Sequence, residues 1–262
     1  NLSLAQFNLR EFLDGIGIVL PAMRDNATLS RFEMSTRLAG TPTSINLNDL
    51  SLKLDDSTFS GNLALSDIAK QALRLQLKGD KLDLDRYLPP ENTDANAGAA
   101  RQNEVKQAVA AAGNSGTTPL PGAPTQQAWS STPLLPLETL RKLDIEAAIG
   151  LGQLTLSKLP IEDARIALTA KGGLINLKEL RGDLHGGEFA VRSQLDARPA
   201  IPLLTASKQI KRIPLEKLLE ARGEKAPVRG LLDLNADVRT QGNSEKAWVD
   251  ALNGNASFSL SD

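Results

Sequence analysis

Most of this chain alternates between apolar and polar residues, which is the pattern of β-strands with one apolar and one polar face. In the first third of the sequence the alternating positions are Phe32, Met34, Thr36 and Leu38, then Leu50, Leu52 and Leu54, then Phe59, Gly61, Leu63 and Leu65, then Leu73, Leu75 and Leu77. The spacers between these segments are short and rich in turn-forming residues. Neighbouring strands are therefore expected to pair antiparallel, as a meander.

The same period of two returns in the second half of the chain. The alternating positions there are Leu143, Ile145, Ala147, Ile149 and Leu151, then Ala164, Ile166, Leu168 and Ala170, then Phe189, Val191 and Leu195, and a further block opens with Leu232 and Leu234. The sequence thus predicts a mainly β fold with short α-helices, built from a repeated antiparallel β-meander.

The sequence of the meander occurs twice in the chain. INLNDLSLKLDDSTFSGNLALSD begins at residue 45, and INLKELRGDLHGGEFAVRSQLDA begins at residue 175. Aligning them pairs Ile45 with Ile175, Asn46 with Asn176, Leu47 with Leu177, Leu50 with Leu180, Leu54 with Leu184, Phe59 with Phe189 and Leu65 with Leu195. We interpret this segment as the strand–turn–strand centre of an internal repeat, with its glycines at turns and bulges rather than around a phosphate.

Short helices are predicted between groups of strands. Similar phrases begin three of them, FNLREFL (7–13), LDLDRYL (82–88) and IPLEKLL (213–219). The first belongs to an amphipathic helix at residues 8–20, which Asn8 can cap and Pro21 ends. Its polar face has no basic excess, so we expect it to cover one end of the sheet rather than lie on a membrane.

Composition divides the chain into four parts. Residues 91–133 are poor in large apolar residues and rich in Ala, Gly, Asn, Thr, Pro and Gln, and only 101–112 has helical propensity. The predicted organisation is a first β-groove repeat at 1–90 that includes the helix at 8–20, a low-complexity linker or surface excursion at 91–133, a second β-groove repeat at 134–224, and the start of a third, truncated repeat at 225–262.

Charge and cysteine content exclude several classes of function. A net charge of −1 with interspersed signs gives no basic face for nucleic acid. The chain has no cysteine, which removes thiol nucleophiles, disulfides and thiolate metal sites. No run of 18 apolar residues could span a membrane as a helix, and no signal peptide opens the chain. We expect the chain to be a piece of a longer protein.

Candidate chemical groups are few. His185 is the only histidine and stands in a turn, where a structural role is much the commoner one. The carboxylate pairs Asp55 with Asp56 and Asp83 with Asp85 fall in turns and caps, where they usually bind backbone N–H groups. No nucleotide-binding or hydrolase motif is present. We therefore predict no catalytic residue, no metal site and no cofactor.

The predicted sheet leaves an apolar face that something must cover. Its two halves could pack on each other as a closed sandwich, or the face could curve into an open hydrophobic groove for acyl chains. The helices are too short to cover the sheet, and aromatic residues make up only 3% of the chain, which argues against a thick core. The residues predicted to line a groove are Leu50, Leu52, Leu54, Leu63, Leu65, Leu73, Leu75, Leu77, Ile145, Ile149, Ile166, Leu168, Phe189, Val191, Leu232 and Leu234.

Several phrases of the sequence resemble the AsmA family. The resemblance covers most of the chain outside 91–133 and is most specific in three places: L-D-I…L-x-L-S-x-L-P-I-E-D, G-G-L-x-x-L…L-x-G-G-x-F, and N-G-N-A-S-F-S-L-S-D. Relatives often have an aromatic residue before the paired glycines, where this chain has His185. AsmA-like proteins are similar to bridge-like lipid transfer proteins, whose strand repeats build a long hydrophobic groove for phospholipids. With this resemblance the open, taco-like β-groove becomes the favoured fold.

The resemblance also implies a location and a function. It implies a Gram-negative protein anchored in the inner membrane by an N-terminal helix absent from this chain, with its bulk in the periplasm and a role in outer-membrane biogenesis. We expect a non-enzymatic module that binds phospholipid for transport between membranes. The alternative is a structural module whose sheet edges recruit envelope proteins that assemble the outer membrane.

Overall fold

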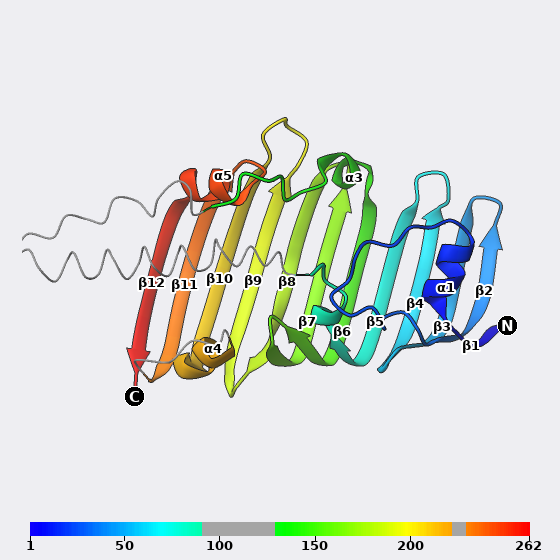
Figure 1. Cartoon of the computed structure of the whole chain (residues 1–262), viewed down its shortest axis with the longest axis horizontal. Coiled ribbons are helices and arrows are strands. Elements are labelled where there is room, and N and C mark those ends of the chain that lie inside the picture. Colours follow the sequence, from blue (N-terminus) through cyan, green and yellow to red (C-terminus); the bar gives the residue numbers. More distant parts are fainter. Residues whose placement is uncertain (91–128, 222–228) are drawn as a thin grey trace, which may run out of the picture.

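A computed structural model describes residues 1–90, 129–221 and 229–262 of the chain. In it, twelve strands form one sheet, and each strand lies beside its neighbours in the sequence (Figure 1). The helices are short: α3, α4 and α5 lie at the ends of the strands, whereas α1 lies in front of the sheet near β2 (Figure 1). The predicted mainly β fold, an open curved sheet with few short helices, is confirmed.

The strands run without a break in their order across the sheet. They are β1 (Leu2–Phe7), β2 (Phe32–Thr41), β3 (Ser44–Leu54), β4 (Ser57–Asp67), β5 (Ala72–Asp83), β6 (Asp144–Leu156), β7 (Leu159–Lys171), β8 (Leu174–Leu184), β9 (Gly187–Asp196), β10 (Leu203–Pro214), β11 (Leu231–Gln241) and β12 (Asn253–Ser261). The helices are α1 (Leu9–Gly15), η1 (Leu84–Arg86), α3 (Leu137–Lys142), α4 (Leu215–Ala221) and α5 (Glu245–Asp250).

All neighbouring strands pair antiparallel except β5 and β6, which are parallel. As a result β1, β5 and β10 all end on the same side of the sheet, and α1, η1 and α4 follow them in the sequence. We call the line of strand ends on this side the lower edge. The helices α3 and α5 lie at the opposite, upper edge (Figure 1). The parallel pair falls where the linker at 91–133 was predicted, most of which lies outside the described residues, as does the expected helix at 101–112. The division of the chain into these four parts stays a prediction.

Helix α1 is shorter than the predicted helix at 8–20. The side chain of Asn8 accepts a hydrogen bond from the backbone N–H of Glu11 (3.1 Å), which is the expected N-cap. The helix ends at Gly15 because Gly17 takes a left-handed conformation, with φ 80°, which closes the last turn. Pro21 therefore lies beyond the helix end rather than at it.

The two copies of the sequence repeat share a β-bulge at the same position. In β3 the register against β4 shifts between Leu47 and Leu50, and in β8 the register against β9 shifts between Leu177 and Leu180. These residues are the ones that the sequence repeat superimposes. A bulge places one extra residue in a strand, so leucines three positions apart point to the same face. The bulge explains why these two strands break a strict period of two.

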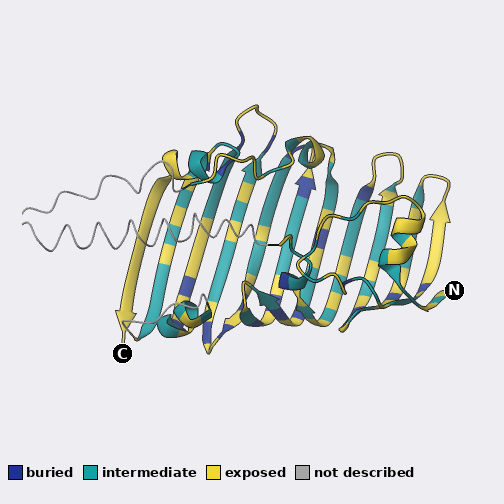
Figure 2. Cartoon of the chain, in the orientation of Figure 1, coloured by how far each residue is buried: buried dark blue, intermediate teal, exposed yellow. Residues whose placement is uncertain are grey.

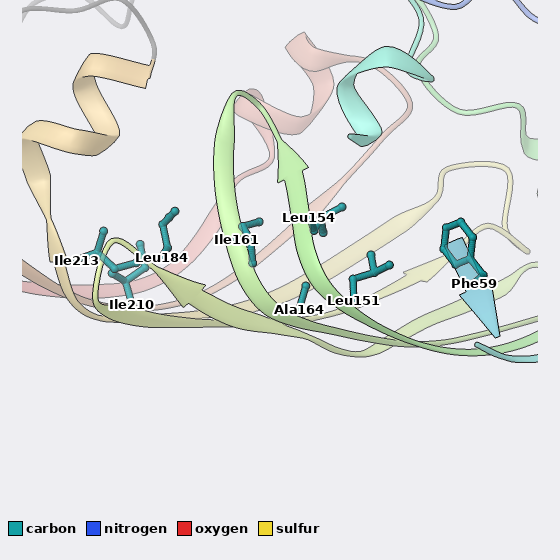
Figure 3. Close-up of a cluster of buried hydrophobic side chains, with 8 residues drawn as sticks. All are labelled: Phe59, Leu151, Leu154, Ile161, Ala164, Leu184, Ile210 and Ile213. Carbon is teal, nitrogen blue, oxygen red and sulfur yellow. The ribbon is translucent and has the colours of Figure 1, made fainter. Parts of the chain in front are cut away.

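The buried core is small and lies towards the lower edge. Its residues are Phe59, Leu151, Leu154, Ile161, Ala164, Leu184, Ile210 and Ile213. Several strands bend there, with left-handed residues at Asp163 (φ 47°) and Arg212 (φ 53°). The hairpin that carries Leu154 and Ile161 rises from the rest of the sheet, and the other buried side chains lie at its base and on both sides of it (Figure 3). Leu84 of η1 and Leu218 of α4 pack against this cluster, which we call the lower corner.

The carboxylate of Asp85 fixes the same corner. It accepts hydrogen bonds from the backbone N–H groups of Ser157 (2.7 Å) and Lys158 (2.6 Å) in the β6–β7 turn. Both turn residues have positive φ, at 54° and 64°, and Asp85 itself is buried. Charge-assisted hydrogen bonds of this kind are among the stronger ones in proteins. Asp85 therefore has the structural role that the sequence predicted for this carboxylate pair, whereas Asp83, at the N-cap of η1, makes no side-chain capping hydrogen bond.

Residues 16–31 form an irregular segment that connects α1 to β2 and contacts η1 on the way. We call this segment the strap. In Figure 1 it passes in front of the sheet from α1 towards η1. The N–H of Arg24 donates to the carbonyl of Leu88 (2.8 Å), and the N–H of Asp25 donates to the carbonyl of Arg86 (3.1 Å). These bonds hold the strap at the lower edge.

Asp55 anchors the other end of the strap. Its carboxylate accepts hydrogen bonds from the N–H groups of Leu29 (2.8 Å) and Ser30 (3.0 Å) and from the hydroxyl of Tyr87 (2.7 Å). Burial raises the pKa of Asp55, but the bonds from Tyr87 and the backbone outweigh it and leave the pKa below its ordinary value. Burial and the neighbouring Asp55 carboxylate raise the pKa of Tyr87, which therefore stays protonated and donates.

Truncating a corner residue should destabilise the protein far more than truncating a leucine in the middle of the sheet. We expect Leu154→Ala to lower the free energy of unfolding by about 3 kcal/mol, because Leu154 is fully buried and a cavity would remain. The matched variant Leu75→Ala should cost about 1 kcal/mol, because Leu75 is already partly exposed. Urea unfolding monitored by circular dichroism measures both, and equal losses would contradict the assignment of the core to the lower corner.

The strap anchor should make stability depend on pH. The pKa of Asp55 is lower in the folded than in the unfolded protein, so its stabilising contribution is complete above about pH 4, the unfolded value, and is lost as the pH falls through the folded pKa. Tyr87→Phe removes one donor to Asp55 and should reduce this acid-dependent loss. The test is to measure the urea midpoint of the unaltered protein and of the variant between pH 6 and pH 2.5. An unchanged pH profile in Tyr87→Phe would argue against a stabilising role of the Asp55 carboxylate.

Candidate functional site

One face of the sheet is apolar from β1 to β12. Residues directly opposite in neighbouring strands point to the same face, so the strand registers trace it. One row joins Leu77, Ile149, Ile166, Leu180 and Val191 in five consecutive strands. Further rows extend it to Leu4 in β1 and to Phe258 in β12. We call this surface the apolar face.

All the residues predicted to line a groove lie on the apolar face. By register it carries Leu50, Leu52, Leu54, Leu63, Leu65, Leu73, Leu75, Leu77, Ile145, Ile149, Ile166, Leu168, Phe189, Val191, Leu232 and Leu234. Leu50 is buried, at 3% exposure, and all the others are partly exposed. That these side chains contact lipid stays a prediction.

The apolar face also carries residues that the sequence analysis missed. Leu47, Leu177 and Leu180 were missed because the bulges in β3 and β8 interrupt the alternation beside them. The sequence repeat pairs Leu47 with Leu177 and could have found them. Strand β10 was missed altogether, because its apolar-face positions read Leu204, Ala206, Lys208 and Ile210, and a lysine breaks the pattern.

Among the residues that the structure describes, no second layer covers the middle of the apolar face. Burial along the strands is intermediate over most of their length, and full burial is confined to scattered positions, many of them near the strand ends (Figure 2). Helix α1 covers the β1–β2 end, where the ring of Phe7 lies 5.6 Å from that of Phe12 and 5.3 Å from that of Phe32. Folded proteins rarely leave so large a continuous apolar surface in water unless it binds something. The structure therefore has the open face rather than the closed sandwich.

The opposite face is polar and carries a shallow hollow. This hollow, of about 840 Å³, lies over β8–β12 and is lined by side chains such as Asn176, Arg192, Gln194 and Arg239. A second hollow on that face, of about 380 Å³, is lined largely by charged side chains. A surface like that of the second hollow suits water better than hydrocarbon. We place the candidate site on the apolar face, whose middle is open in the described residues rather than enclosed.

The polar groups singled out in the sequence have structural surroundings. His185 is exposed in the β8–β9 turn and takes a left-handed conformation, with φ 52°. Asp55 and Asp85 bind backbone N–H groups, and Asp56 accepts a hydrogen bond from Arg86 (3.1 Å). Within the described ranges, no three His, Cys, Asp or Glu side chains gather as metal ligands. The helices of the described chain are all too short or too polar to cross a membrane.

Comparison with known proteins identifies relatives of the sequence. The model of the AsmA family matches residues 4–262. Protein AsmA of Escherichia coli strain K12 is 22% identical over 219 residues, which make up 83% of this chain and 33% of that protein. The chain thus spans about a third of the length of this curated relative. No solved structure matches it. Because the family model covers almost the whole sequence, the chain belongs to the AsmA family.

Proposed function

We propose that this chain binds phospholipid by placing the acyl chains along its apolar face. The observation that carries the proposal is the apolar face, which extends from β1 to β12, has mostly half-exposed side chains, and has no protein layer over its middle in the described residues. Membership of the AsmA family supports the same function.

The energy of acyl-chain burial is large enough for binding. Each methylene removed from water contributes about 0.8 kcal/mol, so a 16-carbon chain gains on the order of 10 kcal/mol before entropic costs. The half-exposed leucines of the protein also lose contact with water, which adds to the favourable free energy of binding. An apolar surface without specific pockets suits acyl chains, because these differ mainly in length and not in polar groups.

The sheet is also long enough to hold several lipids. Twelve strands spaced by about 4.8 Å extend over roughly 50 Å. One leaflet of a bilayer is about 15 Å of hydrocarbon. Lipids could therefore lie one after another across the strands, and the face could act as a path for lipid rather than a single binding site.

We further propose that the chain is a periplasmic section of a protein anchored in the inner membrane, that it takes part in lipid transport to the outer membrane, and that it has no enzymatic activity. The AsmA family supports the location and the role. The surroundings of Asp55, Asp56, Asp85 and His185, which are backbone bonds, ion pairs or solvent, support a binding rather than a catalytic function.

A charge placed on the apolar face should prevent lipid binding. We expect the purified protein to carry phospholipid that mass spectrometry of an organic extract detects, and Leu75→Glu to reduce the bound amount at least about fivefold, because a carboxylate must lose its water when a chain covers it. Gln76→Glu is the matched control. It places the same charge one residue along β5 on the polar face and should leave the bound lipid unchanged.

Two outcomes would contradict the proposal. One is repeated preparations without lipid from cells that make phospholipid. The other is an equal loss of lipid in Leu75→Glu and Gln76→Glu, provided that both variants keep the circular dichroism spectrum of the unaltered protein.

A second candidate function is recruitment of a partner protein by strand pairing. Every residue of β12 is exposed, including Phe258 at 77%, and no described strand pairs with its outer edge. Exposed sheet edges can bind an added strand through backbone hydrogen bonds.

Site-specific crosslinking separates the two functions. A photoreactive residue at Ser257 in β12 should capture protein if the edge recruits a partner, whereas one at Leu168 on the apolar face should capture lipid if the face is a lipid path. Protein adducts at Leu168, or lipid adducts at Ser257 alone, would count against this division.

A further inference from the structure

A single lysine stands on the apolar face. Register places Lys208 of β10 directly opposite Val191 in β9 and Ala236 in β11, both of which belong to that face. Its neighbours two residues away along β10 are Ala206 and Ile210, and Ile210 is part of the buried core. In the described strands, between the upper turns and the lower bends, Lys208 is the one charged residue on the apolar face.

Nothing in the described protein neutralises this charge. Lys208 has neither a hydrogen bond nor an ion pair there, whereas the flanking side chains on the polar face are bonded: Ser207 donates to Asp237 (2.5 Å) and Gln209 donates to Asn235 (3.0 Å). The register also leaves no carboxylate on the apolar face beside it. The ammonium group is thus free to take an anion from outside the protein.

Several of the side chains around Lys208 are small. Ser193 lies diagonally opposite on β9, and Ala206, Ala236 and Ala256 occupy the nearest positions on β10, β11 and β12. In β3–β5 one corresponding row is Leu47, Leu63 and Leu75, and the other has Leu50 and Leu77 on either side of Gly61. The small residues leave room beside the ammonium group for something bulkier than a carboxylate, and the Ser193 hydroxyl, which has no hydrogen bond within the described residues, can add a second donor.

We propose that Lys208 binds the phosphate of a phospholipid headgroup and so sets the position at which a lipid rests on the apolar face. This inference rests on the proposed function. It adds a polar contact for the lipid headgroup to the apolar contacts of the acyl chains. When chains cover the face, the lysine loses water, and a charged group in apolar surroundings needs an opposite charge. A lysine ammonium is a common ligand of phosphate. A fatty-acid carboxylate is the other anion that could reach it, and the experiment separates the two.

The test compares three fluorescent lipids with one acyl label: phosphatidylglycerol, uncharged diacylglycerol, and palmitate. Titration gives a dissociation constant for each with the unaltered protein, Lys208→Met, Lys208→Arg and the control Lys211→Met, which removes a lysine from the polar face of the same strand. We expect Lys208→Met to weaken phosphatidylglycerol binding about tenfold, the loss typical of one charge-assisted bond. It should leave diacylglycerol binding equal or tighter. Lys208→Arg and Lys211→Met should bind all three lipids as the unaltered protein does.

Four results would overturn the inference. Unchanged phosphatidylglycerol binding in Lys208→Met, with new self-association of the variant, would show that the lysine only blocks sheet stacking. Equal losses for phosphatidylglycerol and diacylglycerol would show a packing role. A loss confined to palmitate would assign the carboxylate instead. Failure of the unaltered protein to bind any of the three lipids would overturn the proposed function together with this one.

Discussion

A sheet with only one protein layer leaves its apolar face without a partner, and the rest of this structure follows from that constraint. In a β-sandwich two such faces bury each other. Here twelve strands form one open sheet, and the side chains of its apolar face are mostly half exposed. The hydrogen-bonded ladders hold the strands together, but they do not remove this surface from water. Either lipid or another protein gains free energy by covering it.

One part of the sheet provides most of the stability, and another part provides the proposed binding surface. The bent strand ends at the lower edge, with η1 and α4 packed against them, bury Leu154 and Ile213 almost completely. Asp85 and Asp55 fix the turns and the strap at that edge through backbone N–H groups. The middle of the sheet has no comparable packing. It is therefore free to vary in the size of its side chains, from the leucines of β3–β5 to the alanines around Lys208, without loss of the core.

The order of the strands makes the face continuous. Sequential antiparallel pairing lets each strand extend the surface of the one before it, and the parallel joint of β5 and β6 connects the two groups of strands without a break in the row Leu77–Ile149–Ile166. Equivalent bulges in β3 and β8 keep Leu50 and Leu180 on the same side as their neighbours. A face of this kind can lengthen by addition of strands, which suits a protein whose curated relative is about three times as long as the matched span.

The sequence by itself determined most of the strands, their antiparallel pairing and the apolar face, because a period of two assigns each side chain to a side and short turns leave antiparallel pairing as the simplest connection. It also predicted the structural roles of Asp55 and Asp85. The parallel pairing of β5 with β6 was not predicted. The sequence did not reveal β10, because Lys208 breaks the alternation there. It did not reveal the bulges either, because one extra residue shifts the period without changing the composition. Only the tertiary structure decided whether the face is covered: a half-exposed leucine and a buried one have the same pattern in sequence, and the difference between them depends on what lies across the sheet.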